Sequence, residues 1–126
     1  MVKRYFDVNV FVYFLTESPS FSAKARKWIE ETDEIYTAEI TYYQLIIILS
    51  KLTNNTPEEV LPQIASFFED LGVKFLHLEP HELKKVSEIS KGYNLDFEDS
   101  IHFYLSGKVG ELISNDKDLK KLGAKF

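Results

Sequence analysis

The sequence predicts a single α/β domain over residues 1–126, with a central, mostly parallel sheet covered by helices on both faces. Short β-rich runs alternate with longer segments of helical periodicity along the whole chain, which favours a three-layer α/β/α architecture. The length of 126 residues is typical of one domain, and the 44% of hydrophobic residues suffice for a core. Neither a repeat, nor a low-complexity segment, nor a long linker divides the chain.

The expected elements follow from local patterns in chain order. Residues 3–10 are β-rich and are expected to form a buried first strand that runs into a helix. The further strands are expected at 34–37, 73–78 and 111–114, with a last edge strand at 124–126, and the helices at 20–31, 41–52, 57–71, 80–90, 96–105 and 117–121.

Local signals mark several of these boundaries. Thr56-Pro57 begins a helix well, because Thr is a good N-cap and proline is tolerated at the first helical position. Gly72, Gly92 and Gly107 are expected to end the helices that precede them.

Composition limits the location and the partners. The chain has no cysteine, which excludes disulfides and thiolate metal sites and fits a reducing cytoplasm. No apolar run approaches the roughly 20 residues that span a bilayer, so no membrane partner is expected. Asp7 interrupts the apolar N-terminal stretch and no small-residue cleavage site follows, which argues against a signal peptide. The net charge of −5 means that nucleic acid would have to be met by a local basic patch, a bound metal or a partner.

Three aspartates fall where the predicted sheet would bring them together. Asp7 lies near the end of the first strand, and Asp116 follows the strand around Leu112. Asp99 lies in the first turn of the helix that begins near Asp96. Ligands of parallel sheets bind beyond the carboxyl ends of the strands, so these acids are expected at one rim. Taken singly, each acid is more readily interpreted as a solvated loop residue or a helix cap.

Apolar neighbours around Asp7 and Asp99 suggest that the acids are partly enclosed, in one acidic pocket. Two like charges about 4 Å apart repel by roughly 4 kcal/mol at an effective dielectric constant of 20. Three such carboxylates require a cation or protonation. Oxygen ligands of this kind suit Mg²⁺ or Mn²⁺.

Three motifs together resemble the PIN-domain family. Asp7–Phe11 is similar to its opening D-x-N, Asn94–His102 to its later helix with D-A, and Leu112–Leu119 to its closing T-x-D segment. The motifs keep the family's order and spacing over essentially the whole chain, and the resemblance is closest to small prokaryotic proteins of the VapC toxin type. Carried over, the family's metal-binding aspartates match Asp7, Asp99 and Asp116.

The family's remaining acid is replaced in this chain. It normally closes a T-x-x-E pattern at the start of the second long helix, and the matching stretch here, residues 41–44, ends in Gln44. Gln44 could offer a neutral carbonyl oxygen to the metal with weaker attraction, and one ion is then more plausible than two. Glu39 could substitute if the helix begins elsewhere.

The resemblance implies a metal-dependent endoribonuclease, the toxin of a toxin–antitoxin pair, with RNA as substrate, an antitoxin protein as partner and a homodimer as assembly. The alternative is a PIN-like module that has lost efficient cleavage through Gln44 and binds RNA or protein. A phosphoacceptor receiver domain is disfavoured, because it needs an acidic pair after the first strand and Asp7 stands alone.

Supporting roles are expected for polar residues near the aspartates. Asn9 could orient the Asp7 carboxylate or cap a helix, and Asp96 is expected to cap the helix that carries Asp99. Ser114 and Asn115 could bind phosphate or a ligand carboxylate, or shape a turn. His102 is interpreted as a core histidine rather than a metal ligand. Lysines 117, 120 and 121 form a small basic cluster that could meet RNA phosphates or simply be solvated.

Overall fold

The computed structural model describes residues 1–126 and contains a four-stranded sheet in the order β3-β2-β1-β4. The strands are β1 (Lys3–Phe6), β2 (Glu34–Ala38), β3 (Lys74–Leu76) and β4 (Glu111–Ile113). All three pairings are parallel, so the carboxyl ends of the strands share one rim of the sheet. Strand β1 lies between β2 and β4.

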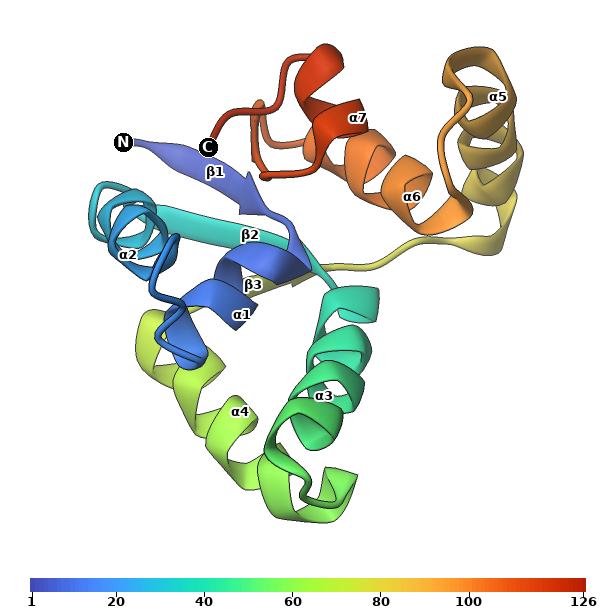
Figure 1. The fold of residues 1–126 in the computed structure, drawn as a ribbon. Helices are drawn as coiled ribbons and strands as arrows, with labels where there is room; N and C mark the ends of the chain where they lie inside the picture. The colour runs from blue at the N-terminus through green and yellow to red at the C-terminus, as the bar shows by residue number, and fades with distance from the viewer.

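Helices cover both faces of the sheet (Figure 1). One face packs against α1 (Val8–Leu15), α2 (Ser22–Glu30), α3 (Glu39–Thr53) and α4 (Pro57–Leu71). The other face packs against α5 (Leu83–Tyr93), which follows the short 3-10 helix η1 (Pro80–Glu82), and against α6 (Phe97–Ser106) and α7 (Lys117–Lys121).

The alternation of side chains along the strands produces this layering. Phe6 and Ile113 point into the core under α1 to α4, whereas Tyr5 and Leu112 point into the core under α5 to α7. The predicted three-layer α/β/α fold is therefore confirmed.

The first strand is shorter than predicted, because the chain turns into helix α1 directly after Phe6. Asp7 keeps an extended backbone and its side chain accepts a hydrogen bond from the Val8 N–H, as an N-cap does. The apolar run 8–15 then packs a helical face into the core through Val8, Val10 and Phe11. The predicted strand at 8–10 was wrong, since this run fits either periodicity.

The predicted start of α4 is confirmed in atomic detail. Thr56 accepts from the Glu59 N–H, the Glu59 carboxylate accepts from the Thr56 N–H, and Pro57 takes the first helical position. Gly72 ends α4 with φ of +64°, which glycine adopts without strain. Gly92, by contrast, lies inside α5, and Asn94 ends that helix with φ of +53°.

At the end of the chain, the expected strand at 124–126 is reduced to a single parallel bridge between Ile113 and Lys125. No helix of the structure combines the length and the apolar character that crossing a bilayer requires.

Candidate metal centre

Asp7 is held rigidly at the carboxyl end of β1. Its backbone N–H donates to the Ile113 carbonyl at 3.0 Å, which extends the pairing between β1 and β4. Its Oδ1 accepts from the Val8 N–H at 2.6 Å and its Oδ2 from the Ser114 hydroxyl at 2.8 Å. The residue is only 4% exposed, so these contacts fix the direction of a buried carboxylate.

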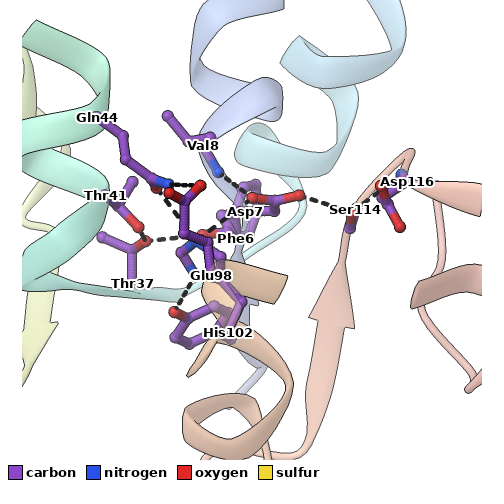
Figure 2. Close-up of polar contacts among 11 residues, drawn as sticks. Phe6, Asp7, Val8, Thr37, Thr41, Gln44, Glu98, His102, Ser114 and Asp116 are labelled. Atoms are coloured by element: carbon purple, nitrogen blue, oxygen red, sulfur yellow. Dashed lines mark hydrogen bonds and ion pairs between the residues drawn. The ribbon is translucent and has the colours of Figure 1, made fainter. Parts of the chain in front are cut away.

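Asp116 reaches the same rim from the neighbouring strand (Figure 2). Ser114 directly follows β4, and its hydroxyl oxygen accepts from the Asp116 N–H at 3.1 Å while it donates to Asp7. The Asp116 Oδ1 accepts from the Leu119 N–H at 2.9 Å and so caps α7. One buried serine therefore connects the two aspartates that follow β1 and β4.

Asp99 lies in the first turn of α6, near enough to Asp7 and Asp116 for their charges to act on it. Burial, together with the negative charges of the nearby Asp116 and Asp7 carboxylates, raises its pKa to about 7. Asp96, the N-cap residue of α6, adds to this repulsion and makes no side-chain capping bond. The three predicted aspartates therefore lie close enough to repel one another.

The three aspartates are enclosed to different degrees: Asp7 is buried, whereas Asp99 and Asp116 are partly exposed. No three acidic or histidine side chains are already arranged as a closed ligand group for a metal ion.

A second polar network lies beside Asp7, between α3 and α6 (Figure 2). The Gln44 Nε2 donates to Glu98 Oε2 at 3.1 Å, and the Gln44 Oε1 lies 3.2 Å from His102 Nε2. The other ring nitrogen of His102 lies 2.6 Å from the Tyr5 hydroxyl. His102 Nε2 is also 3.7 Å from Asp7 Oδ1.

His102 is a core histidine, as predicted, with 1% of its surface exposed. Burial lowers its pKa, although Asp7 and Glu98 act in the opposite direction. Sequence reasoning did not identify Glu98 as part of the site. The available signal was its position directly before Asp99.

Other predicted site residues lie further from the aspartates or have other partners. Asn9 is an exposed residue in the first turn of α1, and Ser114, not Asn9, supplies the side-chain hydrogen bond to Asp7. Glu39 begins α3, and its carboxylate lies 3.2 Å from His77 Nδ1, at the side of the sheet where β3 lies.

Asn115 lies between the acidic rim and a group of aromatic and basic side chains. Its Nδ2 donates to the Tyr13 hydroxyl at 3.3 Å, and its Oδ1 accepts from Lys120 Nζ at 2.6 Å. This hydrogen bond holds Lys120, one of the three lysines of the predicted basic cluster, next to Asn115 and so near Asp116.

The donor set suits a divalent cation in its chemistry. Carboxylate oxygens are the ligands that hard cations such as Mg²⁺ and Mn²⁺ prefer. The raised pKa of Asp99 reflects its burial and the negative charges of the acids around it. Asp7, Asp99 and Asp116 supply oxygen donors of this kind, but their side chains are not arranged as a ligand group in the structure.

These features define an α/β/α protein with an acidic, cation-compatible centre at the carboxyl rim of its parallel sheet. Comparison with protein families gives the particular class: a model described as PIN domain matches residues 4–125. The chain therefore belongs to the PIN-domain family. PIN domains are generally nucleases, and PIN nucleases generally use divalent metal ions.

Solved structures agree with the fold. A chain of "Toxin-antitoxin complex from Klebsiella pneumoniae" superposes with a TM-score of 0.71 at 14% sequence identity, over 98% of this chain and 95% of that chain. A search of curated protein sequences returns no match.

Proposed function

We propose that this protein is a metal-dependent endoribonuclease of the PIN family and the toxin component of a toxin–antitoxin pair. One observation supports the site most strongly. Asp99 lies near Asp7 and Asp116 with its pKa raised to about 7 by burial and by their negative charge. In a family of metal-using nucleases, such an arrangement is suited to bind a cation against a phosphodiester.

Each of the three aspartates is assigned a separate role in this proposal. Asp7 and Asp99 are proposed as the central ligands of Mg²⁺ or Mn²⁺, and Asp116 as the group that holds a second ion or orients the attacking water. When bound, the cation supplies an activated water and charge stabilisation on the phosphate. Ser114 keeps the Asp7 carboxylate aimed at the rim through its 2.8 Å hydrogen bond.

An RNA strand needs local positive charge, because the chain as a whole carries −5. Lys120 is fixed beside the acidic rim by Asn115, and its Nζ lies 6.0 Å from the centre of the Phe126 ring. We propose that Lys120 and Asn115 contact the RNA backbone next to the scissile phosphate.

A protein partner is proposed on the face formed by α3 and α4. Four large apolar side chains on these helices are exposed: Tyr43, Ile47, Leu52 and Leu61. The structural neighbour is named as a toxin–antitoxin complex, and an antitoxin is the corresponding partner proposed here. A homodimer remains part of the proposal and is tested by sedimentation of the purified chain with and without an added antitoxin.

The direct test is cleavage of RNA by the purified protein with Mn²⁺ or Mg²⁺ in the buffer. We expect the wild type to produce defined fragments, chelation by EDTA to stop cleavage, and Asp7→Asn to abolish it. Glu88→Gln serves as the control, because Glu88 is an exposed acid on α5. Cleavage that survives both EDTA and Asp7→Asn would refute a nuclease centre at this rim.

A second function is a PIN-like module that binds RNA or protein without efficient cleavage. Gln44 in place of the family's acid and the lack of a closed ligand group favour this alternative. This alternative is supported if the wild-type protein binds RNA but does not cleave it over a range of cation concentrations.

A further inference from the structure

The side-chain amide of Gln44 contacts the Glu98 carboxylate through its nitrogen and the His102 ring through its oxygen (Figure 2). A carboxylate only accepts hydrogen bonds, so Glu98 requires the NH₂ group of Gln44. The carbonyl oxygen of Gln44 then faces His102 Nε2 at 3.2 Å and requires a donor there. Both ends of the amide are therefore specified by their neighbours.

The same logic extends to the buried end of the network. A neutral imidazole has one donor and one acceptor nitrogen, and Nε2 is the donor here because the Gln44 oxygen that it contacts only accepts. With a proton on Nε2, its Nδ1 accepts from the Tyr5 hydroxyl at 2.6 Å. Burial raises the pKa of Tyr5, so this hydroxyl keeps its proton. Tyr5 therefore donates to His102, His102 donates to Gln44, and Gln44 donates to Glu98.

Glu98, the recipient of these bonds, is connected to Asp7 through Gln44 and His102, whose Nε2 lies 3.7 Å from Asp7 Oδ1. Glu98 precedes Asp99 on α6, and both Glu98 and Asp7 act electrostatically on His102. A glutamate at position 44 would face Glu98 across a contact that now measures 3.1 Å, and the two charges would repel. Position 44 and position 98 together therefore carry one negative charge, supplied by α6 instead of α3.

We propose that Glu98 is the acidic ligand that replaces the one missing from α3, and that Gln44 is the positioning residue that aims it at the centre of Asp7 and Asp99. This inference rests on the proposed metal-dependent function. It differs from a simple helix-capping role for Glu98. An acid in the first turn of α6 would favour the helix whether or not Gln44 held it.

The test is Mn²⁺ binding by calorimetry, which does not depend on catalysis, with RNA cleavage measured in parallel. Glu98→Gln is expected to weaken Mn²⁺ binding by about tenfold or more, and Glu88→Gln to leave it unchanged. The exchange variant Gln44→Glu/Glu98→Gln is expected to recover most of the lost affinity, because the carboxylate returns on α3 and the amide on α6. Glu98 is exposed, so Glu98→Gln is expected to fold, which circular dichroism checks.

A double-mutant cycle tests the positioning role of Gln44. Gln44→Leu is expected to lower Mn²⁺ affinity in the wild-type background but to have little further effect when Glu98→Gln is present. A purely structural role for Gln44 would instead give the same loss in both backgrounds, and that result would overturn its positioning role.

The outcomes separate this inference from the proposed function. Undiminished Mn²⁺ binding by Glu98→Gln, with binding lost in Asp7→Asn, overturns the role of Glu98 and leaves the nuclease proposal standing. Loss of Mn²⁺ binding in Glu98→Gln without RNA cleavage by the wild type supports Glu98 and refutes the nuclease. A wild type that binds no Mn²⁺ overturns both.

Discussion

Ser114 Oγ lies 2.8 Å from Asp7 Oδ2, across 107 positions of the chain, and joins the carboxyl ends of β1 and β4. The same hydroxyl oxygen accepts from the Asp116 N–H, and both Ser114 and Asp7 are buried. The same serine therefore orients the Asp7 carboxylate and links the carboxyl ends of β1 and β4.

We expect Ser114→Ala to lower the free energy of unfolding by about 1–3 kcal/mol, because it leaves a buried carboxylate oxygen without its donor. Urea denaturation at neutral pH measures this. Ser20→Ala is the control, because Ser20 is an exposed turn residue, and it should change stability by no more than about 0.5 kcal/mol. Equal stability of Ser114→Ala and the wild type would mean that Asp7 finds another donor.

The parts of the molecule that sequence could predict are those with local causes. The start of α4 was predictable because Thr56, Pro57 and Glu59 form its capping arrangement within four positions. The meeting of Asp7 and Asp116 was predictable because each follows a strand, and parallel neighbouring strands end at the same rim.

The remainder depends on packing between distant segments. The end of β1 at Phe6 was missed because the apolar run 8–15 suits a strand or a helix, and only burial against α2 and α3 selects the helix. The contact of Gln44 with Glu98 joins residues 54 positions apart on two helices, and no pattern along the chain specifies it.

Asp99 is expected to make stability fall as pH rises. Its pKa is about 7 in the folded protein and near 4 when unfolded, so between these values the folded state binds the extra proton. The penalty for ionising Asp99 is absent below about pH 4. It grows to its full size above pH 7. Asp99→Asn should therefore become progressively more stable than the wild type as pH rises through this window.

Thermal unfolding in EDTA at several pH values between 4 and 8 measures the difference between the two proteins. EDTA is essential, because a bound cation would mask the repulsion. Asp118→Asn is a milder control, since Asp118 is the smallest of the contributors to the Asp99 shift. A difference that stays constant with pH would show that Asp99 ionises normally.

Glu82 is expected to have the opposite dependence on pH. Hydrogen bonds from Lys108 and Tyr104, each 2.6 Å long, lower its pKa to about 2. Its contribution is fully present above its ordinary pKa of 4.5 and is lost as pH falls toward 2. These bonds attach the start of α5 to α6, the helix that carries Asp99.

Glu82→Gln should therefore be clearly less stable than the wild type at pH 7, with the gap closing on acidification. Urea unfolding at pH 7, 4 and 3 tests this, and Glu88→Gln on the following helix α5 should show no such trend. A gap that persists unchanged at pH 3 would assign the effect to packing instead of charge.

Divalent cations are expected to stabilise the protein, and more strongly at high pH. A cation bound among Asp7, Asp99 and Asp116 relieves the repulsion that raises the pKa of Asp99, and binding must displace the Asp99 proton. At a Mn²⁺ concentration one hundred times the dissociation constant, stabilisation amounts to about 2.7 kcal/mol. The shift in melting temperature on adding Mn²⁺ should therefore be small near pH 5 and large near pH 8. In Asp99→Asn the shift should be reduced at every pH and lose this pH dependence, whereas an equal shift in both proteins would place the bound cation elsewhere.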